Sequence, residues 1–110
     1  MKNIIEELTI EYFSAFQNKD SSSLKEMFSK DVSLRDWEIS ATGLKEVLEA
    51  NQGIFDSVDK LEVEIEKLHV CGSSCIAQIK ILANDDTILV ADFIEFDKEN
   101  KIKSVTAYKG

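Results

Sequence analysis

Asp92 is the residue of this sequence most suited to proton chemistry, and it lies in the stretch TILVADFIEFD over residues 87–97. Read with the period of two that is typical of a strand, Asp92 falls in the middle of an apolar face. Its apolar neighbours on that face are Ile88, Val90, Ile94 and Phe96. An ionised carboxylate there loses its hydration, so it must find a partner, take up a proton or face a ligand cavity. A strand-centre aspartate with a hidden Arg, Lys or hydroxyl partner is the competing interpretation.

Asp36 and Tyr12 are two further polar residues within apolar patterns. Asp36 continues the inward set formed by Val32 and Leu34, which makes it a second carboxylate on an apolar face, with Trp37 beside it. Alternatively, Asp36 ends the strand and hydrogen-bonds to a loop amide. Tyr12 lies in the apolar stripe of a helix, so its ring should be buried and its hydroxyl needs a partner. The alternative for Tyr12 is a core tyrosine that reaches a carbonyl.

Periodicity predicts the elements that must position these side chains. Helices are expected over residues 3–18, about 22–29 and about 44–55, with Asn3 as the first N-cap. Strands are expected over residues 32–37, 61–71, 75–83, 87–97 and 102–108. A change of phase near Glu66–Lys67 predicts a β-bulge. This order predicts one α+β domain over residues 1–110, in which helices close the concave face of a curved sheet whose last four strands are antiparallel.

Composition argues against several classes of partner. The 110 residues carry a formal net charge of −8, which disfavours binding to nucleic acid and to anionic membranes. No apolar run approaches the roughly 18 residues of a membrane span, and the N-terminal segment lacks the features of a signal peptide. Cys71 and Cys75 are therefore expected to be buried, reduced thiols of a cytoplasmic protein. No second cysteine pair completes a metal site, and no cofactor is expected.

Two segments of the chain resemble a known family. They are EYFSAFQNKDSSSLKEMFSKDVSLRDW and VADFIEFDKENKIKSVTAYKG, with a glycine before a helix between them. Both are similar to the nuclear transport factor 2-like superfamily, and within it to the SnoaL-like and ketosteroid-isomerase-like groups. The resemblance implies a cone-shaped fold in which three N-terminal helices pack on a curved, mainly antiparallel sheet. It implies less about function, because this fold hosts isomerases, cyclases, dehydratases, hydrolases and binding modules.

The resemblance also implies roles for the three polar residues. Asp36 matches the general base of the isomerases, which moves a carbon-bound proton next to a carbonyl. Tyr12 and a protonated Asp92 match the donors that hydrogen-bond to the carbonyl oxygen. The pocket around them is expected to contain Phe16, Trp37, Asn51, Phe55 and Val90.

The chain departs from the isomerases around the expected pocket. Trp37 replaces the proline that follows their base, and the loop from Asp36 to Gly43 is shorter than theirs. The supporting tyrosine of their third helix would fall near Asn51. These differences imply a ligand smaller than a steroid, namely a small apolar or carbonyl-containing molecule, or no substrate at all.

Three functions therefore remain open: an isomerase-like or cyclase-like enzyme, a ligand-binding or accessory module, and a protein-interaction adaptor. A cavity that connects the three polar side chains to solvent would favour one of the first two functions. An apolar outer patch left uncovered after dimerisation would favour the adaptor. Because neighbouring strands carry apolar residues on both faces, we also expect a two-fold homodimer that forms through the convex face of the sheet.

Overall fold

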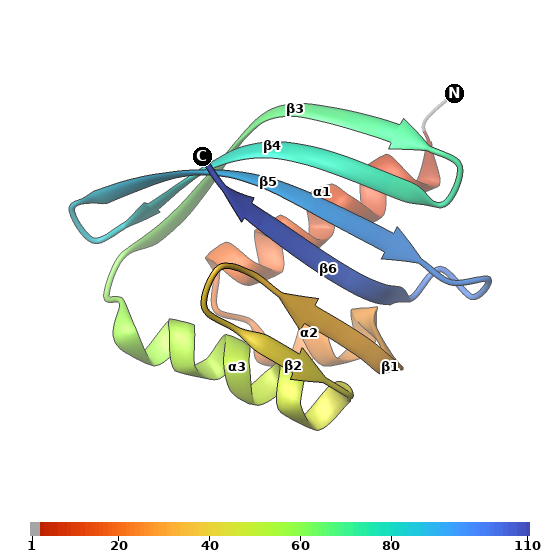
Figure 1. The fold of residues 1–110 in the computed structure, drawn as a ribbon, viewed down its shortest axis with the longest axis horizontal. Helices are drawn as coiled ribbons and strands as arrows, with labels where there is room; N and C mark the ends of the chain where they lie inside the picture. The colour runs from red at the N-terminus through yellow and green to blue at the C-terminus, as the bar shows by residue number, and fades with distance from the viewer. Residues whose placement is uncertain (1–2) are drawn as a thin grey trace.

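The computed structural model describes residues 3–110 as three helices and a six-stranded sheet (Figure 1). The elements in chain order are α1 (Ile4–Gln17), α2 (Ser21–Met27), β1 (Phe28–Arg35), β2 (Ser40–Thr42), α3 (Leu44–Ser57), β3 (Leu61–Cys71), β4 (Ser74–Ala83), β5 (Asp86–Phe96) and β6 (Ile102–Lys109). The strands lie in the order β2-β1-β6-β5-β4-β3. Only the β1–β6 pair among these neighbours is parallel. The predicted α+β class and the curved, mainly antiparallel sheet are confirmed.

Helix α1 begins where its sequence predicts. Asn3 is the N-cap, and its Oδ1 accepts hydrogen bonds from the backbone N–H groups of Ile5 (2.9 Å) and Glu6 (3.3 Å). The buried residues of the helix are Ile5, Thr9, Tyr12, Phe13 and Ala15. They recur at helical spacing, so α1 buries one face, and this face packs against β3 and β4. Tyr12 is thereby fixed in the interior.

The boundary between α2 and β1 differs from the prediction. The second helix was expected to continue to residue 29, but it ends at Met27, and Phe28 already has the extended backbone of a strand (φ −84°, ψ 143°). The reason is a tertiary contact, because Phe28 pairs with Ile102 of β6 in the parallel ladder. The predicted strand over residues 32–37 is also too long at its end. β1 stops at Arg35, so Asp36 lies in the turn that follows.

The short strand β2 was not predicted. It pairs with the end of β1 in antiparallel fashion, Ser33 opposite Thr42 and Arg35 opposite Ser40. Three residues are too few for a period of two to be recognised. Gly43 then begins α3 with φ 92°, a backbone conformation that favours glycine, while its N–H donates to the carbonyl of Val32 (2.8 Å).

Strand β5 divides its side chains between the two faces of the sheet as predicted. Val90, Asp92, Ile94 and Phe96 are buried on the face toward the helices, whereas outward-facing residues such as Phe93 are exposed. The bulge predicted in β3 is confirmed, because the register with β4 shifts between Ile65 and Lys67. The sheet curves over α1 (Figure 1), so its concave face presents Asp92 to the helices.

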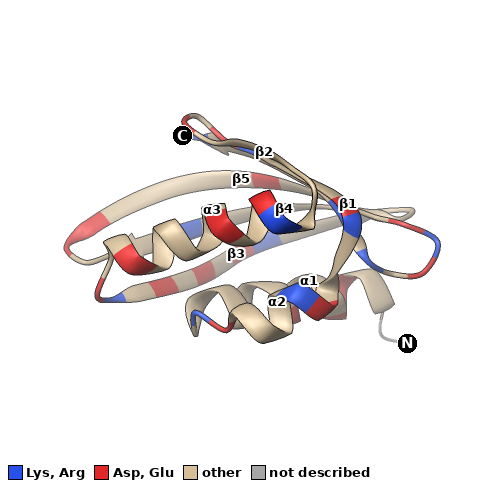
Figure 2. Ribbon diagram, turned by 90° about the horizontal axis from the view of Figure 1, so that it is seen from below, with Lys and Arg blue, Asp and Glu red and all other residues tan. Residues whose placement is uncertain are grey.

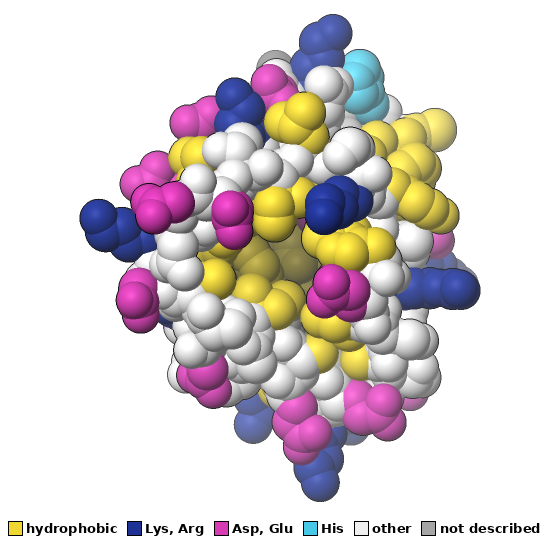
Figure 3. Space-filling view, turned by 60° about the vertical axis from the view of Figure 1, so that its left-hand side comes forward, with side chains coloured by type: hydrophobic (Ala, Val, Ile, Leu, Met, Phe, Trp, Pro, Cys, Tyr) yellow, Lys and Arg dark blue, Asp and Glu magenta, His cyan; other side chains and the backbone are white. Residues whose placement is uncertain are grey.

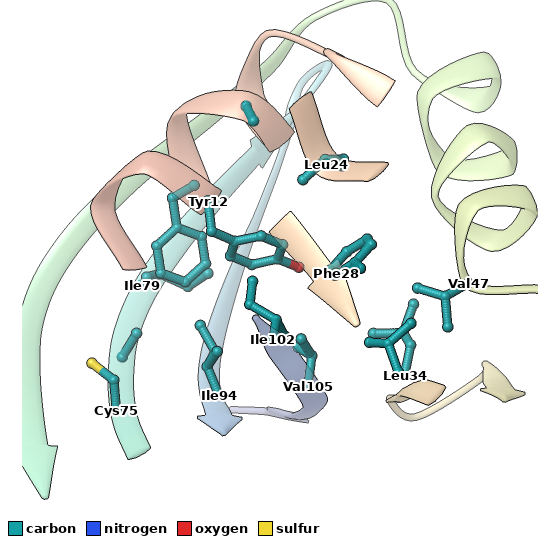
Figure 4. Packing of buried hydrophobic residues seen from close by; sticks show 14 of the residues in the cluster. Tyr12, Leu24, Phe28, Leu34, Val47, Cys75, Ile79, Ile94, Ile102 and Val105 are labelled. Atoms are coloured by element: carbon teal, nitrogen blue, oxygen red, sulfur yellow. The ribbon is translucent and has the colours of Figure 1, made fainter. Parts of the chain in front are cut away.

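Buried side chains from the helices and the sheet meet in a common core (Figure 4). Tyr12, Leu24 and Val47 come from α1, α2 and α3, and Ile94 and Val105 come from the sheet. Leu24, Val47 and Ile94 have no exposed surface. This packing holds the three helices against the sheet and fixes the positions of the residues described below.

The two cysteines differ in exposure. Cys75 is buried, but Cys71 is exposed because it is the last residue of β3 before the hairpin turn. The prediction of two buried thiols is therefore wrong for Cys71.

Acidic and basic residues are interspersed along the helices and strands (Figure 2). Among the helices of residues 3–110, none is both long enough and apolar enough to cross a membrane.

Candidate active site

A cavity of about 350 Å³ is bounded by the concave face of the sheet, α1 and α3. Its wall is mostly apolar, and Figure 3 shows a hollow with a hydrophobic floor and charged side chains at the rim. The polar and charged residues of the wall are Tyr12, Asp36, Glu38, Asn51, Ser57, Asp92 and Lys109. The volume lies near the low end of the roughly 300–1,000 Å³ of small-molecule sites, so it suits a small ligand. Tyr12, Asp36 and Asp92 share this cavity.

Asp92 has only 7% of its surface exposed, at the centre of β5. Its cross-strand neighbours are Ala77 on β4 and Ala107 on β6, and their small side chains leave the carboxyl group free to face the cavity. Burial and, to a lesser extent, the nearby charge of Asp36 raise the pKa of Asp92 to about 7. Near neutral pH, Asp92 is therefore populated as the neutral acid and can donate a hydrogen bond.

Asp36 is held by the turn between β1 and β2. Its Oδ1 accepts hydrogen bonds from the backbone N–H groups of Glu38 (2.7 Å) and Ile39 (2.6 Å). Its own N–H donates to the carbonyl of Ile39 (2.9 Å). The alternative prediction, that Asp36 hydrogen-bonds to a loop amide, is therefore correct for Oδ1. The residue nevertheless also lines the cavity. Since both amides bind Oδ1, the second carboxylate oxygen has no hydrogen-bond partner within residues 3–110 and is available to a ligand.

Tyr12 lines the cavity from α1 and is almost fully buried. Its ring lies among other aromatic rings, with centroid distances of 5.2 Å to Phe13, 6.0 Å to Phe28 and 6.4 Å to Phe16. Figure 4 shows the hydroxyl oxygen directed away from α1 toward Phe28 and the sheet. Burial raises the pKa of Tyr12 well above its ordinary value, and the charge of Asp92 adds to this effect. The hydroxyl thus remains a hydrogen-bond donor throughout the physiological pH range.

The structure distributes the expected pocket residues over two locations. Phe16, Trp37, Asn51 and Val90 all line the cavity. Phe55 does not lie in the wall; it is buried in the core, where its ring meets the ring of Phe16 edge-on at 5.4 Å. The spacing of buried residues in α3 explains this position. Phe55 lies eight residues after Val47, about two turns of helix, so the two side chains share the buried face.

Sequence reasoning missed two charged residues of the wall. Lys109 lies with its Nζ 5.8 Å from the centroid of the Trp37 ring, a cation–π contact at the cavity. The period of two in β6 places Lys109 on the face of Val105 and Ala107, so the pattern contained this signal. Glu38 enters the wall from the turn after β1, where no periodicity points to it.

Comparison with known proteins shows the family to which the chain belongs. The family model of the SnoaL-like domain matches residues 9–105, which include all three polar residues discussed above. The chain belongs to the SnoaL-like domain family. No curated protein is similar enough in sequence to match it.

Solved structures of low sequence identity share the fold of this SnoaL-like chain. One is a nuclear transport factor 2-like protein of unknown function from Cytophaga hutchinsonii, with a TM-score of 0.84 and 14% identity over 100% of this chain and 93% of the other. A provisionally assigned ketosteroid isomerase from Kribbella flavida gives 0.85 and 17% identity over 96% and 77% of the two chains. A provisionally assigned SnoaL-like polyketide cyclase from Shewanella denitrificans gives 0.83 and 14% identity over 99% and 92%. At these identities, the similarity establishes the nuclear transport factor 2-like fold.

The cavity of this SnoaL-like domain brings together two carboxyl groups in different surroundings. Asp92 is buried on the strand face, whereas Asp36 is half-buried and bound by turn amides. Across residues 3–110, no three His, Cys, Asp or Glu side chains gather in a way that could hold a metal ion. The arrangement can combine an acceptor of protons, Asp36, with two neutral donors, Tyr12 and Asp92.

Proposed function

We propose that this SnoaL-like protein is an enzyme of the isomerase or cyclase type, which transfers a proton at the carbon next to a carbonyl group of a small, mostly apolar substrate. The observation that carries the proposal is the shared cavity of Asp36 and Asp92, in which burial raises the pKa of Asp92 while Asp36 lies half-buried in a turn. Two carboxyl groups in such different surroundings can divide the roles of base and hydrogen-bond donor.

In this mechanism, the free oxygen of Asp36 removes a proton from the carbon next to the carbonyl. The electron pair of the broken C–H bond forms a C=C bond, and negative charge moves to the carbonyl oxygen. Tyr12 and neutral Asp92 donate hydrogen bonds to that oxygen, and they stabilise the charge because their positions are fixed before the reaction. Asp36 then returns its proton to the same or a neighbouring carbon.

A ligand-binding module without catalysis is the second candidate. It is supported by the two turn amides on Oδ1, because these bonds give Asp36 a structural role that needs no chemistry. The two candidates differ in one measurable property. Only the enzyme accelerates removal of a carbon-bound proton.

Exchange of the carbon-bound protons of cyclohexanone with deuterium, followed by NMR in D2O, tests the proposal. The wild-type protein should accelerate this exchange, and Asp36→Asn should reduce the acceleration by about 100-fold or more, because a general base is lost. Asn keeps an oxygen that can accept from Glu38 and Ile39, so the turn should persist. Asp31→Asn, which alters an exposed carboxylate on β1, the strand that precedes Asp36, is the control. Cyclohexanone that binds without any accelerated exchange would favour the binding module.

We also propose that two copies of the chain associate through the convex face of the sheet. Four exposed apolar residues support this assembly: Ile76, Leu89, Phe93 and Tyr108. Ile76 lies opposite Phe93 in the β4–β5 ladder, and the rings of Phe93 and Tyr108 meet edge-on with their centroids 5.5 Å apart. A contiguous apolar surface on a sheet face is a typical protein–protein contact.

A further inference from the structure

Helix α3 carries a buried polar residue that the proposed proton transfer does not use. Its buried residues are Val47, Asn51 and Phe55, one stripe with a four-residue step. The amide of Asn51 therefore interrupts an apolar stripe at a position where Leu would pack with less loss of hydration. Asn51 has only 2% of its surface exposed.

The amide nitrogen of Asn51 lacks a hydrogen bond. Nδ2 is buried and finds no partner within residues 3–110. A buried donor without a partner destabilises a folded protein, so such a group requires a reason for its presence. Asn51 also lines the same cavity as Asp36 and Asp92. A ligand in the cavity can therefore supply the acceptor that the protein does not.

Asn51 and Asp92 belong to different walls of the cavity. Asn51 lies on α3, which packs against β1, β2 and α2, whereas Asp92 lies on β5 in the sheet. A ligand that binds Tyr12 and Asp92 through one oxygen on the sheet side can present a second atom to Asn51 on the helix side. Among the other wall residues of α3, Ile54 is apolar and Ser57 donates its hydroxyl to the carbonyl of Ile54 (2.8 Å), so the unpaired donor belongs to Asn51. One acceptor atom of the ligand is thus sufficient there.

We propose that Asn51 is a specificity-determining residue that donates a hydrogen bond from Nδ2 to a second oxygen of the substrate, so that the substrate class is a small carbonyl compound with a further carbonyl, ether or hydroxyl oxygen. This inference rests on the proposed function for the position of the first oxygen. The second oxygen fixes the orientation of the substrate in the cavity. It also makes the enzyme reject analogues that lack it, because the donor is then left unpaired.

Two matched probes test the inference, namely cyclohexane-1,4-dione and cyclohexanone. They share a ring and one carbonyl, and only the dione has a second oxygen on the far side of the ring. Binding is measured by NMR titration, separately from deuterium exchange. The wild-type protein should bind the dione about tenfold more tightly than cyclohexanone, because an unpaired donor gains an acceptor. Asn51→Leu, which keeps the branched shape without the donor, should bind both probes equally.

Stability provides the second measurement. Asn51→Leu should have a melting temperature no lower than the wild type, since it removes a buried unpaired donor. Asn51→Ala loses the same donor without added bulk and is used in the titration if the Leu side chain disturbs the fold. The control is Asn100→Ser, which alters an exposed amide in the turn between β5 and β6 and should keep the tenfold preference.

The outcomes separate this inference from the proposed function. Loss of the dione preference in Asn51→Leu or Asn51→Ala supports the inference, whether or not the protein catalyses exchange. The inference is overturned if the wild-type protein fails to bind the dione or binds both probes equally, or if the preference survives in both variants. It is also overturned if both variants are strongly destabilised, because Asn51 is then a structural residue. If deuterium exchange depends on Asp36 but the wild-type protein does not prefer the dione, the proposed function is supported and the role of Asn51 is overturned.

Discussion

Asp36 and Asp92 carry the same functional group, but their surroundings give it different properties. Asp92 lies between two alanines on the buried face of β5, and no hydrogen bond from residues 3–110 stabilises its charge. Asp36 binds two backbone amides in a turn. In the proposed mechanism, this difference in environment makes Asp92 the hydrogen-bond donor and Asp36 the base.

The raised pKa of Asp92 predicts a pH dependence of stability. The folded protein binds a proton at Asp92 up to about pH 7, whereas the unfolded chain releases it near the ordinary value of 3.8. Between these values the folded state binds more protons, so the free energy of unfolding falls as pH rises, by on the order of 4 kcal/mol in total. Above pH 7 this dependence ends. Asp92→Asn should abolish it and should be neutral or stabilising at pH 7.5.

Urea unfolding at pH 5 and pH 7.5 measures this difference for the wild type and for Asp92→Asn. Glu95→Gln, which alters an exposed carboxylate on the opposite face of the same strand, should keep the wild-type dependence on pH. A wild-type free energy of unfolding that does not fall between the two pH values would contradict the prediction. Marked destabilisation of Asp92→Asn would show instead that Asp92 is a structural residue.

The pattern of the sequence locates buried residues well but does not locate the space between them. A period of two was enough to find Asp92, and it also contained Lys109, which follows Val105 and Ala107 on one face of β6. The resemblance to the isomerases suggested a place for Phe55 in the pocket, although its ring packs against Phe16 in the core. Burial follows from local periodicity, whereas the choice between core and cavity depends on how separate elements pack.

At the scale of elements, the N-cap residue Asn3 is predicted to stabilise the folded protein measurably through α1. Asn3→Ala removes the oxygen that accepts from the N–H groups of Ile5 and Glu6, so the free energy of unfolding should fall by about 1 kcal/mol. Asn3→Ser keeps an acceptor and should lose much less. Chemical unfolding at pH 7 measures both variants. Equal stability of Asn3→Ala and the wild type would show that the end of the helix is held by its packing alone.

Elements with a long periodic sequence were predicted, and those fixed by distant contacts were not. The helix α1, the four strands β3–β6 and the bulge in β3 all follow from patterns of ten or so residues. The strand β2 is too short for such a pattern. Phe28 was assigned to a helix because its neighbours form one, but pairing with Ile102 holds it in a strand. No local signal in the sequence reports this partner.

At the scale of the whole molecule, the convex face of the sheet predicts a homodimer. Phe93→Glu adds a charge to the apolar patch, so the dimer should dissociate to a monomer at micromolar concentration, as measured by light scattering. Ser22→Glu adds the same charge on the exposed surface of α2 and should leave the dimer intact. A wild-type protein that is already monomeric at that concentration would remove this proposal.

The parallel pairing of β1 with β6 has a consequence for how the protein folds. Phe28 and Ile102 are far apart in the sequence, so their ladder closes a long loop, and we expect it to form after the local hairpins of β3, β4 and β5. Asp36 follows β1, and Asp92 precedes β6, so the two carboxyl groups meet only when this ladder exists. A ligand that contacts both carboxyl groups should therefore slow unfolding of the protein without changing the rate at which these hairpins form.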